Sequence, residues 1–275
     1  MESQEILEEY FECSDIEHFQ RGKDENSRFW SRFNEIPSFE GAAVLDVGSG
    51  WGSLGVDMAS AGAKKVVGLD IKCRLVDFAN CYTKKICPHL AETIQFECLD
   101  LKHYDEQAVF DIIVSKDSFE HIIDLSGMIE EMKKRLKPGG KIYAGFGPLY
   151  TSPYGDHDRR RTILKSWGIF GQILALIPWL HLLIEPILVT MYNRYREKKI
   201  TSIRDLQLNK FAWSDYREIF RKSGLNIVYL SKNNSVSMSS RLLSILAKLS
   251  FLEDLCIHNV YCILEKAVDQ ALILQ

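Results

Sequence analysis

A glycine-rich turn after a short apolar run holds the first residues of this chain that could do chemistry. The stretch 44–52 reads Val-Leu-Asp-Val-Gly-Ser-Gly-Trp-Gly. Its glycines let the backbone turn sharply and approach a ligand with no side chain between them. Asp46 places a carboxylate beside that approach, which favours a ligand with a positive charge. The stretch therefore predicts a buried strand, an acid near its end and a ligand-binding turn.

The same turn also fits a dinucleotide fingerprint, because residues 50–55 match G-x-G-x-x-G. In that arrangement a pyrophosphate lies on the helix N-terminus just past the strand. The carboxylate of Asp46 would repel it. S-adenosylmethionine (SAM) carries an ammonium and a sulfonium, so it suits Asp46 better. The stretch resembles the first motif of class I SAM-dependent methyltransferases.

A second acid follows at the spacing expected of a ribose-binding carboxylate. Residues 65–70 form an apolar run that ends in Asp70, 18 residues beyond Gly52. Such a carboxylate can accept hydrogen bonds from two ribose hydroxyls. The plain alternative is a surface acid after a strand, and the preceding glycine turn favours the ribose role.

The resemblance to these methyltransferases continues downstream and covers residues 41–147. It implies that Asp100 bonds the adenine amino group, that Leu101 packs on the ring, and that backbone around Lys116 faces the methionine part of SAM. The expected cofactor contacts are Asp46, Gly48, Gly50, Trp51, Gly52, Asp70, Ile71, Asp100, Leu101 and Lys116.

A Glu-His pair, Glu120 and His121, follows the fourth apolar run. In small-molecule methyltransferases such a pair often begins the helix after strand four. Leu-Lys-Pro-Gly-Gly at 136–140 is another frequent feature of the family, and it should break a helix before a strand at 141–146. Methyltransferases of nucleic-acid base amino groups usually carry Asn/Asp-Pro-Pro-Tyr/Phe after strand four, whereas this chain has Lys-Asp-Ser-Phe at 116–119.

Strand-like and helix-like segments alternate from 43 to 146, which predicts parallel strands joined by right-handed crossovers, with helices on both faces. The resemblance implies a Rossmann-like α/β fold with a seven-stranded, mostly parallel sheet. Its last strand, expected at 256–264, should run antiparallel between strand five and strand six, which is expected at 225–230. One crossover helix should carry the apolar stripe Ile122, Ile123, Leu125, Met128, Ile129, Met132 and Leu136.

Four segments follow from this reading. They are an N-terminal helical cover (1–40), a SAM-binding core (41–147), a helical insertion between strands five and six that selects the substrate (148–212), and a return to the sheet (213–275). In the first segment, Phe29, Trp30, Phe33 and Ile36 have helical spacing, which predicts a helix over 27–39.

The composition is that of a globular protein that can bury a full core. The 275 residues are 46% apolar and 26% charged, and the net charge of −3 gives no general attraction to nucleic acid. Seven cysteines occur, an odd number without a C-x-x-C pair, which favours reduced thiols over disulfides or a metal site. An acidic start without a signal-peptide pattern agrees with a cytoplasmic protein.

The loop 147–158 follows strand five at the sheet edge where ligands bind in open parallel sheets. His157 is the first candidate for a general base that takes the proton of an alcohol or phenol, and His121 is the second. A purely structural histidine is the alternative for each. Tyr150, Tyr154 and Asp156 are the candidate substrate contacts. A metal at 156–158 is disfavoured, because three adjacent residues rarely point at one ion.

The region from 167 to 192 is unusually apolar and has basic flanks, including 159–161 and 194–199. Prolines and polar residues interrupt it, which disfavours a transmembrane span. A lid over an apolar substrate is the first interpretation, a packed helical subdomain the second, and a segment of 159–199 lying on a membrane surface the third.

These features predict methyl transfer from SAM to a small or lipid-like acceptor, with oxygen favoured as the target atom. An N-methyltransferase is one alternative. A non-catalytic SAM-binding or membrane-associated partner protein is another. The sequence contains no signal of the oligomeric state.

Overall fold

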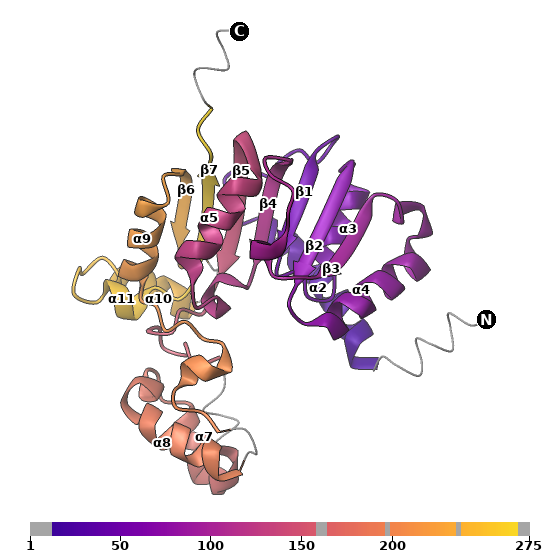
Figure 1. The fold of residues 1–275 in the computed structure, drawn as a ribbon. Helices are drawn as coiled ribbons and strands as arrows, with labels where there is room; N and C mark the ends of the chain where they lie inside the picture. Colours follow the sequence, from indigo (N-terminus) through magenta and orange to yellow (C-terminus); the bar gives the residue numbers. More distant parts are fainter. Residues whose placement is uncertain (1–12, 158–163, 196–198, 235–237, 269–275) are drawn as a thin grey trace.

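One seven-stranded sheet organises the protein (Figure 1). The computed structural model describes the chain except residues 1–12, 158–163, 196–198, 235–237 and 269–275. The strand order is β3-β2-β1-β4-β5-β7-β6; β1 to β5 are parallel, and β7 is antiparallel to both β5 and β6. The predicted seven-stranded, mostly parallel sheet is confirmed, as is the antiparallel last strand between strands five and six. The strands are β1 Ala43–Val47, β2 Lys65–Asp70, β3 Ile94–Cys98, β4 Phe110–Lys116, β5 Leu136–Phe146, β6 Asn226–Lys232 and β7 Val260–Glu265.

Helices cover both faces of the sheet, as predicted. Successive strand residues point to opposite faces, so Val44 packs in one apolar core with α2, α3 and α4, and Leu45 packs in the other with α5 and α9. The helices are α2 Cys13–Trp30, α3 Ser53–Ser60, α4 Cys73–Ile86, α5 Leu125–Arg135, α7 Gly168–Ala175, α8 Leu180–Tyr195, α9 Trp213–Lys222, α10 Met238–Leu246 and α11 Glu253–Cys256.

Several predicted boundaries are wrong. The helix expected over 27–39 is the end of α2, which stops at Trp30 ahead of Pro37; Phe33 is still buried, whereas Ile36 is 61% exposed. The helix expected to include Ile122 and Ile123 begins only at Leu125, where Asp124 caps it by accepting the Gly127 N–H.

The last strands also differ from prediction at their ends. Strand β5 already begins at Leu136, which pairs with Phe110; the register then shifts across Gly139, whose φ is +77°, before Lys141 pairs with Ile112. Cys256, expected to open strand seven, is instead the last residue of α11, and β7 begins only at Val260 after a short connection. These shifts leave the strand order and the direction of each strand unchanged.

The insertion between β5 and β6 contains α7 and α8, which project away from the sheet (Figure 1). Its inner side has a small apolar core of its own, formed by Tyr150, Leu164, Ala175, Leu188, Met191 and Leu208. Within the described residues, no helix is both long and apolar enough to cross a membrane.

Candidate active site

A cavity of about 890 Å³ opens at the carboxyl edge of the sheet. Because β1, β2 and β4 are parallel neighbours, their carboxyl ends and the turns that follow meet there. Nine of the ten predicted cofactor contacts line the cavity, namely Asp46, Gly48, Gly50, Trp51, Asp70, Ile71, Asp100, Leu101 and Lys116. The tenth, Gly52, is the N-cap of α3 and lies against Phe96 and Ala79.

Gly52 shows why this turn needs glycine. Its φ is +85°, and a Cβ there would lie 2.7 Å from the Phe96 ring and 2.8 Å from the Cβ of Ala79. The turn is held from below, since the N–H groups of Gly48 and Ser49 both donate to the carbonyl of Leu69. The chain thus passes close over β2 and β3 and reaches the first residue of α3 in a fixed position.

Asp70 fixes the rim of the turn. Its Oδ2 accepts the Gly50 N–H at 2.9 Å, and its Oδ1 accepts the Lys72 N–H at 2.9 Å. Asp100 is held similarly on the neighbouring strand end, where it accepts the Lys102 N–H at 3.1 Å. Burial raises the pKa of Asp100, but the bonds from Lys102 outweigh it and the net pKa lies below its usual range. The two carboxylates therefore mark one side of the cavity with negative charge.

Asp46 is the most buried of the carboxylates that line the cavity. It is 1% exposed, and its Oδ2 has no hydrogen-bond partner among the described residues. Burial and then the charge of Asp70 raise its pKa to about 7, although Lys116 acts in the opposite direction. A buried carboxyl oxygen without a partner carries a desolvation cost that a cationic ligand would remove.

The helix α2 closes the cavity from the side. Its Asn26 accepts a hydrogen bond from the Lys116 Nζ at 3.0 Å and donates to Asp57 on α3. The Trp51 ring stacks on His18 with centroids 4.4 Å apart, and its Nε1 donates to Asp15. These α2 residues carry no sequence motif, and the sequence reasoning missed them.

The segment after β4 brings a second set of polar groups to the cavity. His121 lines the cavity, and its ring lies 5.0 Å from that of His157 between centroids. Glu120 is buried behind them; its Oε1 accepts the Gly147 N–H at 3.2 Å, while burial and then Asp117 raise its pKa to about 8. Glu120, His121 and His157 each offer an atom within 4.8 Å of the others, a grouping that also suits a metal ion.

The hydrogen bonds of the two histidines set their tautomers. His121 Nδ1 lies 2.7 Å from the Gln207 carbonyl oxygen, and His157 Nε2 lies 3.0 Å from the Pro148 carbonyl oxygen. A carbonyl oxygen only accepts, so each of these nitrogens carries a hydrogen. The basic nitrogens of the neutral rings are then His121 Nε2 and His157 Nδ1.

Comparison with known proteins agrees with this geometry. Residues 38–145 match the family model described as a methyltransferase domain. Residues 38–145 therefore form a methyltransferase domain, and the sheet order agrees with the class I fold that the sequence predicted. Phosphoethanolamine N-methyltransferase 1 of Zea mays is 28% identical over 208 residues, which cover 72% of this chain and 40% of that protein. A ubiquinone biosynthesis O-methyltransferase of Idiomarina loihiensis is 31% identical over 112 residues, 40% of this chain and 44% of that protein.

The chain thus spans less than half the length of these curated relatives. Among solved structures, phosphoethanolamine N-methyltransferase 2 of Haemonchus contortus in complex with SAM has a TM-score of 0.54 at 16% identity, covering 89% of this chain and 52% of that chain. A geranyl diphosphate methyltransferase in complex with SAM has a TM-score of 0.55 at 11% identity, covering 89% and 85%. At these identities the similarity establishes the fold.

The predicted substrate contacts lie outside the cavity lining. Tyr150 donates from its hydroxyl to Glu185 at 2.6 Å, and Tyr154 donates to the Leu176 carbonyl at 3.1 Å. Asp156 is fully buried, with an oxygen 4.0 Å from His181. These contacts join the loop to α8 and to the end of α7 within the insertion, and a role in substrate binding stays a prediction.

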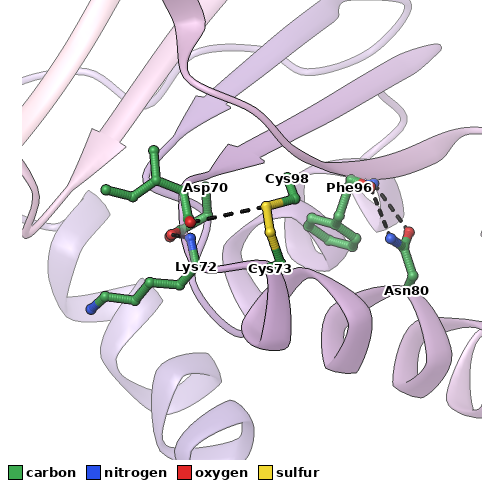
Figure 2. Close-up of a disulfide and its surroundings, with 7 residues drawn as sticks. Asp70, Lys72, Cys73, Asn80, Phe96 and Cys98 are labelled. Atoms are coloured by element: carbon green, nitrogen blue, oxygen red, sulfur yellow. Dashed lines mark hydrogen bonds between the residues drawn. A yellow bond between two sulfur atoms is a disulfide. The ribbon is translucent and has the colours of Figure 1, made fainter.

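A disulfide corrects the expectation of reduced thiols. Cys73, the first residue of α4, is bonded to Cys98, the last residue of β3, with Cα atoms 4.8 Å apart (Figure 2). Figure 2 shows the bond beside Asp70 and Lys72. The odd number of cysteines and the absence of C-x-x-C could not predict this pair, because the fold of the sheet brings together two residues 25 positions apart. Cys13, Cys81, Cys87, Cys256 and Cys262 are free.

Proposed function

We propose that this protein transfers a methyl group from SAM to the oxygen of a small or lipid-like acceptor. The observation that carries the proposal is Asp46, a buried carboxylate whose Oδ2 has no partner among the described residues and which faces a cavity rimmed by Asp70. Bound SAM would supply an electrophilic methyl group. The residues present fit its other parts, with Asp70 suited to ribose hydroxyls and Asp100 to the adenine amino group.

The acceptor would bind at the other end of the cavity, beside His121. Ile122, Ile123 and Met128 line that end together with Gln207, so an apolar acceptor with one polar group suits it. The basic Nε2 of His121 can take the acceptor's hydroxyl proton as the methyl group is transferred, and His157 stands next to it to share that proton. Alignment of the reactants supplies much of the remaining rate.

Relatives named for N-methylation and for O-methylation both match the chain, so the relatives do not decide the target atom. The choice between oxygen and nitrogen therefore rests on the chain's own residues. A hydroxyl acceptor must lose its proton as the methyl group is transferred. A neutral amine attacks with its lone pair and needs no base at that step. The histidine pair is therefore the feature that supports oxygen over nitrogen. A non-catalytic SAM-binding protein would need the cofactor side of the cavity and would have no use for this pair.

The test begins with calorimetric titration of SAM, S-adenosylhomocysteine and NAD. Methyl transfer to panels of phenols, alcohols and amines is then followed by S-adenosylhomocysteine release. We expect binding of both adenosyl compounds and turnover of a hydroxyl acceptor. His121→Ala should lower kcat by about 100-fold, the usual share of a general base, while His89→Ala, an exposed histidine outside the cavity, should have no effect.

The outcomes separate the alternatives. Turnover of amines that survives His121→Ala would identify an N-methyltransferase. Cofactor binding without turnover of any acceptor would favour a non-catalytic binding protein. Tight NAD binding with no heat from either adenosyl compound would reject the SAM site altogether. Loss of turnover on treatment with a chelator would give Glu120 and the two histidines a metal-binding role instead of proton transfer.

A further inference from the structure

The outer side of the insertion is an exposed apolar surface. We call α7 and α8, with the connection between them, the helical hairpin. On α7 and just after it, Ile169, Phe170, Ile173, Leu176 and Ile177 are exposed at the spacing of one helical face, and Ile169 is 77% exposed. On α8, Leu183 and Ile187 are exposed one turn apart, and Leu183 is 81% exposed.

This exposure is not a consequence of poor packing. The opposite side of the hairpin contributes Ala175, Leu188 and Met191 to the small core of the insertion. The hairpin is therefore already held on its inner side while its outer apolar stripe faces water. Adjoining exposed apolar side chains of this kind mark an interaction surface.

The sequence that contains the hairpin is rich in basic residues. Residues 159–199 contain eight Lys and Arg but two Glu, in a chain whose net charge is −3. Among the described cations, Lys165 just before α7 and Arg194 in the last turn of α8 are exposed. The acid within the hairpin, Glu185, faces inward, where it accepts from Tyr150 and pairs with Lys210. The hairpin thus combines an exposed apolar stripe with exposed basic residues at its two ends.

Two of the three earlier interpretations account poorly for this surface. A lid would turn its apolar side to the cavity, yet no residue of α7 or α8 lines it. A packed subdomain would bury the outer stripe, which is exposed. A second copy of the chain would bring two segments with the same positive charge together, which is unfavourable.

We propose that the helical hairpin docks in the surface of a membrane that contains anionic lipid. Apolar side chains of α7 and α8 would enter the region between headgroups and acyl chains, and the basic ends would contact lipid phosphates. The hairpin lies in the surface and does not cross it, in agreement with the length of its helices. The sheet and the cavity stay outside, since the hairpin projects from them (Figure 1). This proposal does not depend on methyl transfer.

The test uses the full-length protein and sedimentation with vesicles of phosphatidylcholine, with or without phosphatidylserine. We expect binding that requires phosphatidylserine and weakens as sodium chloride is raised, because salt screens the contacts of the basic ends. The double variant Ile169→Glu/Phe170→Glu should bind at least about tenfold more weakly, since two apolar side chains no longer enter the lipid. Ile36→Glu, which changes an exposed isoleucine remote from the hairpin, is the matched control.

Circular dichroism and S-adenosylhomocysteine affinity verify that each variant is folded. Equal vesicle binding by the double variant and the wild-type protein would overturn the proposal. Equal binding to vesicles with and without phosphatidylserine would overturn its electrostatic part. A concentration-dependent dimer that disappears in the double variant, without vesicle binding by the wild type, would show that a second copy covers the stripe and would also overturn it.

Discussion

The carboxyl edge of the sheet and the helical hairpin of α7 and α8 arrange polar and apolar groups in opposite ways. At the sheet edge, carboxylates such as Asp46 are buried, and backbone N–H groups hold Asp70 in place. On the hairpin, large apolar side chains such as Ile169 and Leu183 face outward. Each arrangement costs free energy in the isolated chain, and each would be relieved by a different partner.

The difference shows how strongly each region constrains its ligand. The sheet edge fixes individual atoms, so it selects a ligand by charge and hydrogen bonding. The hairpin presents an apolar surface and positive charge, without polar groups held in fixed positions, so it suits a fluid partner. If this contrast is right, substitutions at one region should leave the other unaffected.

The largest effect should come from Asp70→Asn. Loss of the negative charge weakens the bond from the Gly50 N–H and the expected bonds to ribose, each an interaction of about 1.5–3 kcal/mol when one partner is charged. We expect S-adenosylhomocysteine to bind roughly 100-fold more weakly by calorimetry. Asp105→Asn, at an exposed acid outside the cavity, and Leu183→Glu on the hairpin should change the affinity by less than about twofold. A comparable loss in the hairpin variant would break the contrast between the regions.

Gly52→Ala should have the next largest effect, and it acts on stability. At φ +85° an alanine is strained, and its Cβ would lie closer to Phe96 and Ala79 than van der Waals contact allows. We expect the free energy of unfolding in urea to fall by about 2 kcal/mol. Gly50→Ala is the matched control, because its φ of +53° is also left-handed but its Cβ would meet open space. Equal losses in the two variants would mean that the close approach to β3 contributes nothing.

The sheet edge could be predicted from the sequence because its signals are local. Val44 to Gly52 contains the strand, the acid and the turn in one stretch, and Asp70 follows at a fixed spacing. Parallel pairing of β1 with β2 then brings the two acids to one edge without further information. The resemblance to a known family supplied Asp100, Leu101 and the place of β7.

What the sequence did not predict depends on contacts between distant segments. His18 and Asn26 reach the cavity because α2 packs across α3, and no spacing in α2 indicates that contact. The disulfide requires knowledge that the ends of β2 and β3 are neighbours. Helix ends at Trp30 and Leu125 are set by packing and by capping at Asp124, which outweigh the apolar periodicity that extends beyond them.

Cofactor affinity should depend on pH through Asp46. Its pKa is about 7 in the folded protein, above its ordinary value of 3.8, so the carboxyl is mostly protonated at pH 6 and mostly charged at pH 8. A cationic ligand needs the charged form, so SAM should bind about tenfold more tightly at pH 8 than at pH 6. Calorimetry in buffers of different ionisation enthalpy should show proton release on binding near pH 6, and Asp46→Asn should flatten the profile.

The same shift has the opposite sign for the stability of the free protein. A carboxyl whose pKa is raised by folding adds to the free energy of unfolding when it is protonated. That contribution is complete below the pKa of the unfolded chain and is lost as pH rises through 7. Glu120, with a pKa raised to about 8, acts in the same direction. Bound SAM should therefore raise the unfolding midpoint more at pH 8 than at pH 6. An equal rise at both values would contradict a role for Asp46 in holding the cationic end.

The smallest effect should come from the disulfide. Cys73 lies three residues after Asp70, and Cys98 lies two residues before Asp100, so the bond ties together the two strand ends that carry these carboxylates. Reduction leaves the sheet intact but lets the adenosine end of the cavity move, and ordering it again on binding costs entropy. We expect S-adenosylhomocysteine affinity to fall about threefold in dithiothreitol, and Cys73→Ser to show the same loss without reductant.

Cys81→Ser, at an exposed free thiol on the same helix α4, should bind like the wild type and keep its response to dithiothreitol. Vesicle binding by the hairpin should be equal in the oxidised and reduced protein, because the link touches the sheet edge alone; a parallel loss of lipid binding would mean that the two regions are coupled.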